Sequence, residues 1–333
     1  MSGSLMLLDS ASLYFRAFYG VPDSMRSPAG EPVNAVRGLL DMIARLVTDH
    51  RPDRLVACWD EDWRPEFRVA AIPSYKAHRA VGGAEAAAAA LAGGPPAVEE
   101  VPDALAPQVP VIAEVLAALG IARAGAAGFE ADDVIGTLTA REVARPPGER
   151  RPVLVVTGDR DLFQLVDDDV PVRVLYPVRG IKDPDVVDVA RLREKYAVAS
   201  GPAYADMAVL RGDPSDGLPG VAGIGEKTAA TLLERYGTLD AVRAAALDPG
   251  DRGLTVTQRR RLLEASDYLD VAPAVVHVAA DAPVVLADGT DPAAPDAFAV
   301  PREPADPEAL VDLTERWGLD SSVRRVLSAL AAR

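Results

Sequence analysis

The sequence predicts an α/β fold in which a mainly parallel sheet is flanked by helices. Three continuous apolar runs, at residues 5–8, 55–59 and 152–156, have the length of buried strands. Segments with helical periodicity, such as residues 36–47 and 109–119, separate these runs. Alternation of buried strands with helices is typical of a parallel sheet covered by helices.

Each of the three runs leads into aspartate. Asp9 ends the first run, Asp60 ends the second, and Asp159 and Asp161 follow the third. Ligands of such sheets sit at the carboxyl ends of the strands, where these side chains would meet. One aspartate there would mean little, but several converging on one edge predict a site.

Residues 128–136 add three carboxylates: Glu130, Asp132 and Asp133. The apolar residues that follow at helical spacing indicate the first turns of a helix packed on the core, after a fourth candidate strand at residues 121–124. Glu130 and Asp133 are neighbours at i,i+3 and repel unless a cation lies between them. Taken alone, acids in a first turn also complement the helix dipole.

A turn-rich loop at residues 210–217 supplies two further acids. The complete candidate set is Asp9, Asp60, Glu130, Asp132, Asp133, Asp159, Asp161, Asp213 and Asp216. Oxygen ligands without histidine or cysteine favour Mg²⁺ or Mn²⁺ over zinc. So many carboxylates suit two ions roughly 4 Å apart, as in phosphodiester hydrolysis. Singly, Asp161, Asp213 and Asp216 are equally typical of helix caps and turns.

The composition indicates a cytoplasmic protein of about two domains. The chain has 333 residues, 49% of them hydrophobic, and a single cysteine, Cys58, which excludes an intramolecular disulfide. No secretion signal or membrane-spanning stretch is expected. The net charge of -15 counts against a nucleic-acid partner, although clustered metal-binding carboxylates lower the total without abolishing a local basic strip.

Such a strip follows Asp60. It interleaves four basic with four aromatic or imidazole side chains: Arg64, Arg68, Lys76 and Arg79 with Trp63, Phe67, Tyr75 and His78. This pattern suits phosphate contacts and base stacking, or equally a solvated amphipathic helix. The next residues, 82–97, are rich in Ala, Gly and Pro and predict a short helix between flexible joints or a mobile loop.

Residues 218–229 form a glycine-rich run that opens a helix. Free amides at that helix start, with Lys227 beside them, can hold a phosphate, whereas the plainer interpretation is a helix-helix turn. Glu226 interrupts the spacing of a nucleotide-binding P-loop. Further on, the basic run at residues 259–261 is either a phosphate contact or a solvated face, residues 281–307 predict a loop-rich connection, and residues 323–330 a final amphipathic helix.

In combination, these motifs resemble the 5′-nuclease, or flap-endonuclease-like, superfamily, in the bacterial form found as the N-terminal domain of DNA polymerase I. The matching stretches occur in family order across about residues 5–290, and they include Leu8-Asp9-Ser10, Trp59-Asp60, Tyr75-Lys76-Ala77-His78-Arg79, Phe129-Glu130-Ala131-Asp132-Asp133, Thr157-Gly158-Asp159-Arg160-Asp161 and Gly212-Asp213-Pro214-Ser215-Asp216-Gly217. No polymerase domain follows, so we expect a free-standing 5′-3′ exonuclease.

The resemblance implies a PIN-like catalytic domain at residues 1–185 with an arch at about 62–103, a DNA-binding helix-hairpin-helix domain at 186–290, and an extension at 291–333. It implies two Mg²⁺ ions, with Mn²⁺ as the alternative. The first would be surrounded by Asp9, Asp60, Glu130, Asp132, Asp133 and Asp159, and the second by Asp161, Asp213 and Asp216. Lys76 and Arg79 match residues that engage the scissile phosphate in the family.

The same resemblance implies DNA contacts from Arg16, Arg68, Tyr75, Gly220, Gly223, Gly225, Lys227 and Thr228, and a K⁺ ion held by carbonyls near Val221 and Gly223. The expected reaction is hydrolysis by metal-activated water, leaving a 5′-phosphate, on flaps, nicked or 5′-overhanging duplexes, or RNA primers. We expect a monomer with no membrane partner.

Three other classes remain as alternatives: a DNA-binding scaffold without activity, a haloacid-dehalogenase-type phosphatase, and a PIN-type ribonuclease. The scaffold would lack carboxylates that are all present here. The phosphatase needs its Asp-x-Asp after the first strand, where this chain has Asp9-Ser10-Ala11, and the ribonuclease lacks the glycine-rich hairpin.

Overall fold

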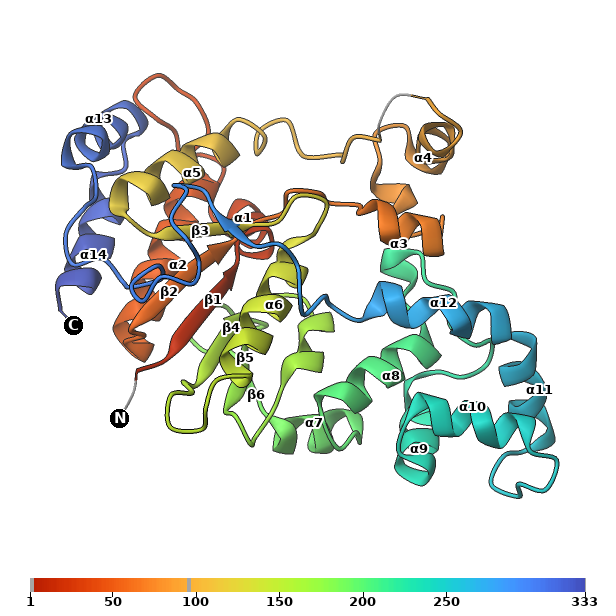
Figure 1. The fold of residues 1–333 in the computed structure, drawn as a ribbon. Coiled ribbons are helices and arrows are strands. Elements are labelled where there is room, and N and C mark those ends of the chain that lie inside the picture. Colours follow the sequence, from red (N-terminus) through yellow and green to blue (C-terminus); the bar gives the residue numbers. More distant parts are fainter. Residues whose placement is uncertain (1–2, 95–96, 333) are drawn as a thin grey trace.

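A seven-stranded sheet forms the centre of the molecule, and the predicted α/β class is confirmed. The computed structural model describes residues 3–94 and 97–332. The strand order is β6-β5-β4-β1-β2-β3-β7, in which only the edge strands β6 and β7 run antiparallel to their neighbours (Figure 1). The strands are β1 (Leu5–Asp9), β2 (Arg54–Cys58), β3 (Ala122–Gly125), β4 (Val153–Val156), β5 (Val172–Tyr176), β6 (Asp185–Val187) and β7 (Val285–Leu286).

Alternate residues of the central strand β1 enter two separate cores. Leu5 and Leu7 pack with helix α6 (Ala131–Val143) and the helices beyond it. Met6 and Leu8 pack on the other face with α1 (Ser10–Gly20), α2 (Asn34–His50) and α5 (Gln108–Leu119). Because β1 is buried on both faces, its sequence is a continuous apolar run, as predicted for a central parallel strand.

The segment between β2 and α5 stands out from the sheet. It contains α3 (Glu66–Ala71), a 3₁₀ turn (Ala77–Arg79) and α4 (Gly83–Leu91), so the Ala-rich run is a short helix. Two backbone hydrogen bonds close its base, from Val81 N to Val98 O and from Glu100 N to Arg79 O, both 2.8 Å. The described residues on either side, 79–81 and 98–100, are therefore paired at the base of this segment, beside the carboxyl edge of the sheet.

A helical part follows β6. Its helices are α7 (Val189–Tyr196), α8 (Gly201–Arg211), α9 (Glu226–Tyr236), α10 (Leu239–Leu247), α11 (Val256–Glu264) and α12 (Ser266–Val276). Figure 1 shows α9, α10 and α11 farthest from the sheet, while α8 and α12 lie nearer to it. Arg259 donates to the carbonyls of Ala245 and Ala246 at the end of α10, so it caps that helix.

The last part of the chain returns to the sheet. Strand β7 pairs with β3. Residues 298–300 then run beside the start of β2, where Leu55 N donates to Phe298 O and Val300 N donates to Asp53 O. Helices α13 (Pro307–Trp317) and α14 (Asp320–Ala331) then cover α5 and α2. Residues 281–307 are mostly loop, as predicted, but the sequence patterns indicated neither β7 nor α13.

Among the described residues, no helix combines the length and apolar character needed to cross a membrane.

Candidate active site

Carboxylates from separate elements meet at the carboxyl edge of the sheet, as predicted. Asp9 is the last residue of β1, and its side chain accepts hydrogen bonds from Ser12 N (3.1 Å) and Thr157 Oγ1 (2.6 Å). Asp60 lies just beyond β2 and accepts from the backbone N–H of Ala131 at 2.7 Å, at the start of α6. The strands and the helix therefore fix these two carboxylates in place through ordinary caps and turns.

A cleft of about 230 Å³ opens between these acids and the base of the arch. Its lining includes five carboxylates of the candidate set, Asp9, Asp60, Glu130, Asp132 and Asp159, together with Lys76 and Arg79. A small adjoining hollow is lined by Glu130, Asp132, Asp161 and Asp216. The two hollows share Glu130 and Asp132, so Asp161 and Asp216 lie next to the acids of the first hollow, whereas Asp213 borders neither.

Several of these acids have pKa values above the usual range, because the fold makes their charged forms unfavourable. Burial raises the pKa of Asp9 to about 7, and the nearby Asp60 charge adds to the rise against the opposing Thr157 hydrogen bond. Burial likewise raises the pKa of Asp60 to about 6. The pKa values of Asp132 and Asp161 lie well above their usual range, through burial first and through neighbouring aspartates second. Such a cluster is stabilised when a cation enters it.

Glu130 differs because it already has cationic partners. Burial would raise its pKa, but Lys76 and Arg68 lower it below the usual value. Lys76 forms an ion pair with Glu130, and Arg79 forms one with Asp216 at 2.5 Å. The Lys76 backbone is in the left-handed region, with φ of +48°. Both cations thus lie inside the acidic cleft, where each is held by one carboxylate.

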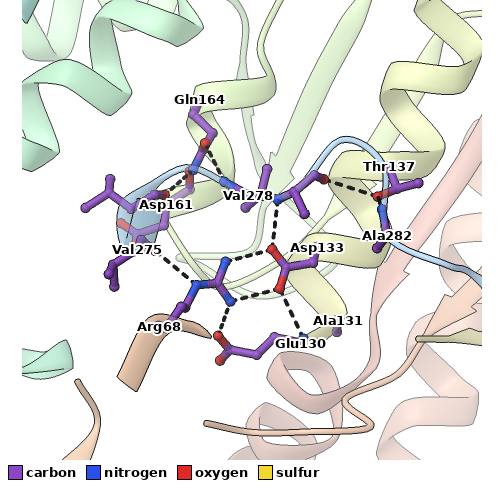
Figure 2. A network of polar contacts seen from close by, with 12 residues as sticks. Arg68, Glu130, Ala131, Asp133, Thr137, Asp161, Gln164, Val275, Val278 and Ala282 are labelled. Atoms are coloured by element: carbon purple, nitrogen blue, oxygen red, sulfur yellow. Dashed lines mark hydrogen bonds and ion pairs between the residues drawn. The ribbon is translucent and has the colours of Figure 1, made fainter. Parts of the chain in front are cut away.

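Arg68 supplies the cation that the Glu130–Asp133 pair requires. Its guanidinium donates to both carboxylates, with bonds of 2.7 and 2.8 Å to Asp133, and to the carbonyl of Val275 at 3.0 Å (Figure 2). Asp133 also accepts from the backbone N–H groups of Glu130 and Ala279. The cation between these two acids is therefore a side chain of the protein, and it joins α3, α6 and the end of α12.

Three sequence-based assignments are corrected by this network. Asp133 borders neither hollow, whereas Glu130 borders both, and both Asp133 oxygens are taken by four hydrogen bonds, so Asp133 is wrong as a metal ligand. Arg68 is buried in the same network, and Tyr75 is buried with its hydroxyl donating to Glu130, so both are wrong as DNA contacts. The sequence analysis expected Arg68 and Tyr75 to contact DNA because the pattern of the basic strip does not show which of its side chains point into the core.

The other predicted residues lie where a ligand can reach them. Asp132 and Asp161 make no side-chain hydrogen bond within the described part of the chain. Asp159 accepts from Asp161 N, and Asp213 caps the 3₁₀ turn Pro214–Asp216 through Ser215 N. Arg16 lies beside Gly158, at the edge of the cleft. Sequence reasoning missed Thr157, which orients Asp9, and Glu99, which lines the cleft from the end of the arch.

The glycine-rich run forms a tight turn between α8 and α9. Gly220 has φ of +64°, and a Cβ there would meet the Arg211 carbonyl oxygen at 2.3 Å, so only glycine fits. Gly223 and Gly225 face open space instead. Val221 is buried, Thr228 is half-buried, and Lys227 is exposed in the first turn of α9. The run therefore presents free amides and one cation on an open surface.

The residues present fit divalent cations by their chemistry. They offer oxygen ligands with raised pKa values in a partly enclosed cleft. Within residues 3–94 and 97–332, no three Asp, Glu, His or Cys side chains are placed so that they could hold a metal ion together without other ligands. Magnesium commonly keeps several waters and uses one or two carboxylates with substrate phosphates, so an open arrangement suits it.

We expect the stability of the metal-free protein to fall as the pH rises from about 4 to about 7. Because the folded pKa values of Asp9 (about 7) and Asp60 (about 6) exceed the ordinary aspartate value of 3.8, the folded state binds more protons than the unfolded state in this window. Thermal unfolding in EDTA at pH 5 and pH 8 measures the loss. Mg²⁺ should raise the melting temperature more at pH 8. If Mg²⁺ raised the melting temperature equally at pH 5 and pH 8, this expectation would be contradicted.

Comparison with known proteins agrees with this architecture. Residues 4–197 match the profile of the 5′-3′ exonuclease N-terminal resolvase-like domain, and residues 200–294 that of the 5′-3′ exonuclease C-terminal SAM fold. A 5′-3′ exonuclease of Streptomyces coelicolor is 61% identical over 98% of this chain and 100% of its own length. A 5′-3′ exonuclease of Mycobacterium tuberculosis is 52% identical over 99% and 98%.

More distant relatives share only part of the sequence or the fold. DNA polymerase I of Mycobacterium bovis is 41% identical over 78% of this chain but only 27% of its own length. The T5 D15 protein co-crystallised with metal ions shares the fold with a TM-score of 0.60 at 16% identity, over 98% of this chain and 99% of its own. The two profiles and the two full-length relatives show that the chain belongs to the 5′-3′ exonuclease family.

Proposed function

We propose that this protein hydrolyses DNA phosphodiesters as a metal-dependent 5′-3′ exonuclease and flap endonuclease in replication and repair. One observation carries the proposal: acids from β1, the β2 end, the α6 start and the β4 end line one cleft with Lys76 and Arg79. Carboxylates alone would repel a phosphate, so the cleft suits this substrate only with cations bound. The two full-length relatives are both named 5′-3′ exonuclease, which supports the exonuclease part of the proposal.

Two Mg²⁺ ions, or Mn²⁺, would occupy the two groups of acids. Asp9, Asp60, Glu130, Asp132 and Asp159 would hold the first, and Asp161, Asp213 and Asp216 the second, in part through water. When bound, such a pair supplies an activated water and neutralises the charge on the attacked and leaving oxygens. The T5 protein, described as crystallised with metal ions, has the same fold, which is consistent with this arrangement.

Lys76 and Arg79 would contact the scissile phosphate. Each is paired with a single acid, Glu130 or Asp216, and each borders the cleft. A phosphate between the two cations would take over these contacts. No histidine or serine nucleophile is required, because the cleft binds and orients the phosphate while water attacks.

The glycine-rich turn would hold the duplex backbone. The amides of Gly223 and Gly225, the Thr228 hydroxyl and the Lys227 ammonium would contact phosphates, and Gly220 would set the turn that brings them to the backbone. Carbonyls of Val221 and Gly223 would hold a K⁺ ion, and Arg16 would contact a phosphate at the edge of the cleft. Contacts of this kind recognise backbone shape, so the expected specificity is for DNA structure and not for base sequence.

We expect Gly225→Ala to weaken duplex binding about tenfold, a loss of about 1.4 kcal/mol, and to lower the melting temperature only slightly, because alanine is a poorer N-cap of α9 than glycine. The φ of Gly225 is -88° and nothing lies within 4 Å of an added Cβ, so the methyl group adds no strain and obstructs only an approaching ligand. Fluorescence anisotropy with a labelled duplex measures the binding. Gly20→Ala, equally open but on α1, is the control. Equal affinities of the two variants would exclude the turn as a DNA contact.

The proposed organisation is a catalytic domain at residues 1–185, a DNA-binding domain at 186–290 and an extension at 291–333, acting as a cytoplasmic monomer. The pairing of β7 with β3 and the continuous core beneath α6 and α8 are consistent with a close association of the first two parts.

A 5′-labelled flap duplex tests the proposed function. With Mg²⁺, the protein should cut near the junction, while Asp161→Ala and Asp213→Ala should still bind the flap without cutting it. If the intact protein binds flaps but cuts with neither Mg²⁺ nor Mn²⁺, the proposed activity is wrong and a role in DNA binding alone replaces it.

A further inference from the structure

A second hollow lies at the opposite edge of the sheet from the acidic cleft. It has a volume of about 480 Å³ and borders Leu5 and Arg54, the first residues of β1 and β2. The second half of α6 forms one wall, and residues 291–293 with Phe298 form another. We call this hollow the arginine pocket.

The arginine pocket has an apolar lining beneath charged groups. Leu5, Leu138, Val284 and Phe298 are all buried and border it. Its volume falls within the range of roughly 300–1,000 Å³ that is typical of small-molecule sites. A free inorganic phosphate would leave most of that volume and the apolar lining unused.

Three arginines border the pocket: Arg54, Arg141 and Arg145. The acid between them, Glu142, is buried and already paired with Arg145 at 3.1 Å and with Arg151 at 3.6 Å. The charges of Arg54 and Arg141 therefore remain without a carboxylate partner among the described ion pairs. In a chain of net charge -15, this is a local positive excess.

These arginines also have hydrogen-bond donors to spare. Within the described residues, the Arg54 side chain donates one hydrogen bond, to Pro295 O at 2.5 Å, and Arg141 one, to Ala282 O at 3.3 Å. A guanidinium carries five N–H donors in a planar fork that matches phosphate oxygens. Burial lowers the pKa of Arg54, and the Arg151 and Arg145 charges lower it further, so a bound anion would relieve this repulsion.

We propose that the arginine pocket binds a small organic phosphate of nucleoside monophosphate size. Arg54 and Arg141 would hold the phosphate, and Leu138 and Phe298 would contact the organic part. Asp291, on the rim, repels the ligand and limits its affinity. This site is separate from the acidic cleft and does not depend on the nuclease activity proposed above.

Isothermal titration of the full-length protein in EDTA at fixed ionic strength tests this site, with deoxyadenosine 5′-monophosphate and inorganic phosphate as probes. We expect the nucleotide to bind more tightly than phosphate. Arg141→Gln should weaken nucleotide binding about tenfold, and Asp291→Asn should strengthen it. Arg141 and Asp291 are both exposed, so neither change threatens the fold.

Two control variants locate the binding. Arg45→Gln removes an exposed arginine on α2 that does not border the arginine pocket, so nucleotide binding should not change. Lys76→Gln alters the acidic cleft and should also have no effect. The proposal is overturned if no saturable binding is seen up to about 10 mM, if Lys76→Gln abolishes binding while Arg141→Gln does not, or if phosphate binds as tightly as the nucleotide.

Discussion

Asp132→Asn should abolish cleavage of a 5′ flap, with a loss on the order of a thousandfold or more, while leaving the fold intact or slightly more stable. Asp132 borders both hollows of the site, so its charge is available to both groups of proposed metal ligands. Without this charge the proposed metal ions would stabilise the transition state less by several kcal/mol, and each loss of about 1.4 kcal/mol lowers the cleavage rate about tenfold. Single-turnover cleavage with saturating protein measures the chemical step.

The unchanged or increased stability follows from the surroundings of Asp132. Within the described residues its carboxylate receives no hydrogen bond, and Asp9, Asp159 and Glu130 all raise its pKa after burial has done so. A neutral amide removes that repulsion, so the melting temperature in EDTA should not fall. Asp23→Asn, on an exposed loop, is the matched control and should change neither quantity. A melting temperature lowered as strongly as the activity would mean that Asp132 supports the fold instead.

Arg68→Ala should destabilise the protein by about 3–5 kcal/mol, the usual cost of removing one partner from a buried ion pair. The substitution leaves Glu130 and Asp133 as buried acids three residues apart and frees the Val275 carbonyl (Figure 2). Urea unfolding, followed by circular dichroism, measures the difference. Arg45→Ala removes an exposed i,i+4 pair and should cost only about 0.3–0.5 kcal/mol.

The acid sensitivity of the Arg68 variant gives a second measurement. Without the guanidinium, Glu130 loses one of the two cations that hold its pKa below the usual value. Its pKa then rises toward the unfolded value, so the variant loses less stability than the wild type as the pH falls, and the difference in stability between the two narrows at low pH. If Arg68→Ala is as stable as Arg45→Ala at pH 8, the buried network contributes little and Arg68 would again be available to a ligand.

The strands and the acids at their ends could be predicted because both are local signals. A central parallel strand is buried on both faces, so β1 and β4 appear as unbroken apolar runs, and the acid that follows each marks the edge where ligands bind. The helix start at Glu130 was equally clear, because its first turn carries the acids and its next turns the apolar face.

The direction of the basic side chains could not be predicted in the same way. Arg68 and Arg79 lie on the same strip, yet one is buried against Asp133 and the other reaches the cleft. Their local patterns do not differ, because the distinction arises from partners far away in the sequence. Strand β7 was missed for a similar reason: with two residues, it is defined by its pairing with β3 and not by any periodicity.

The late return of the chain to the sheet also constrains biosynthesis. When residues up to about 284 have left the ribosome, β3 still lacks its outer neighbour β7, and α2 and α5 still expose the surfaces that α14 and α13 later cover. Trp317, Val326 and Leu330 then complete the core on that side. The β3 edge of the sheet therefore stays unpaired until residues 285–286 have emerged, and until then it is open to association with other nascent chains.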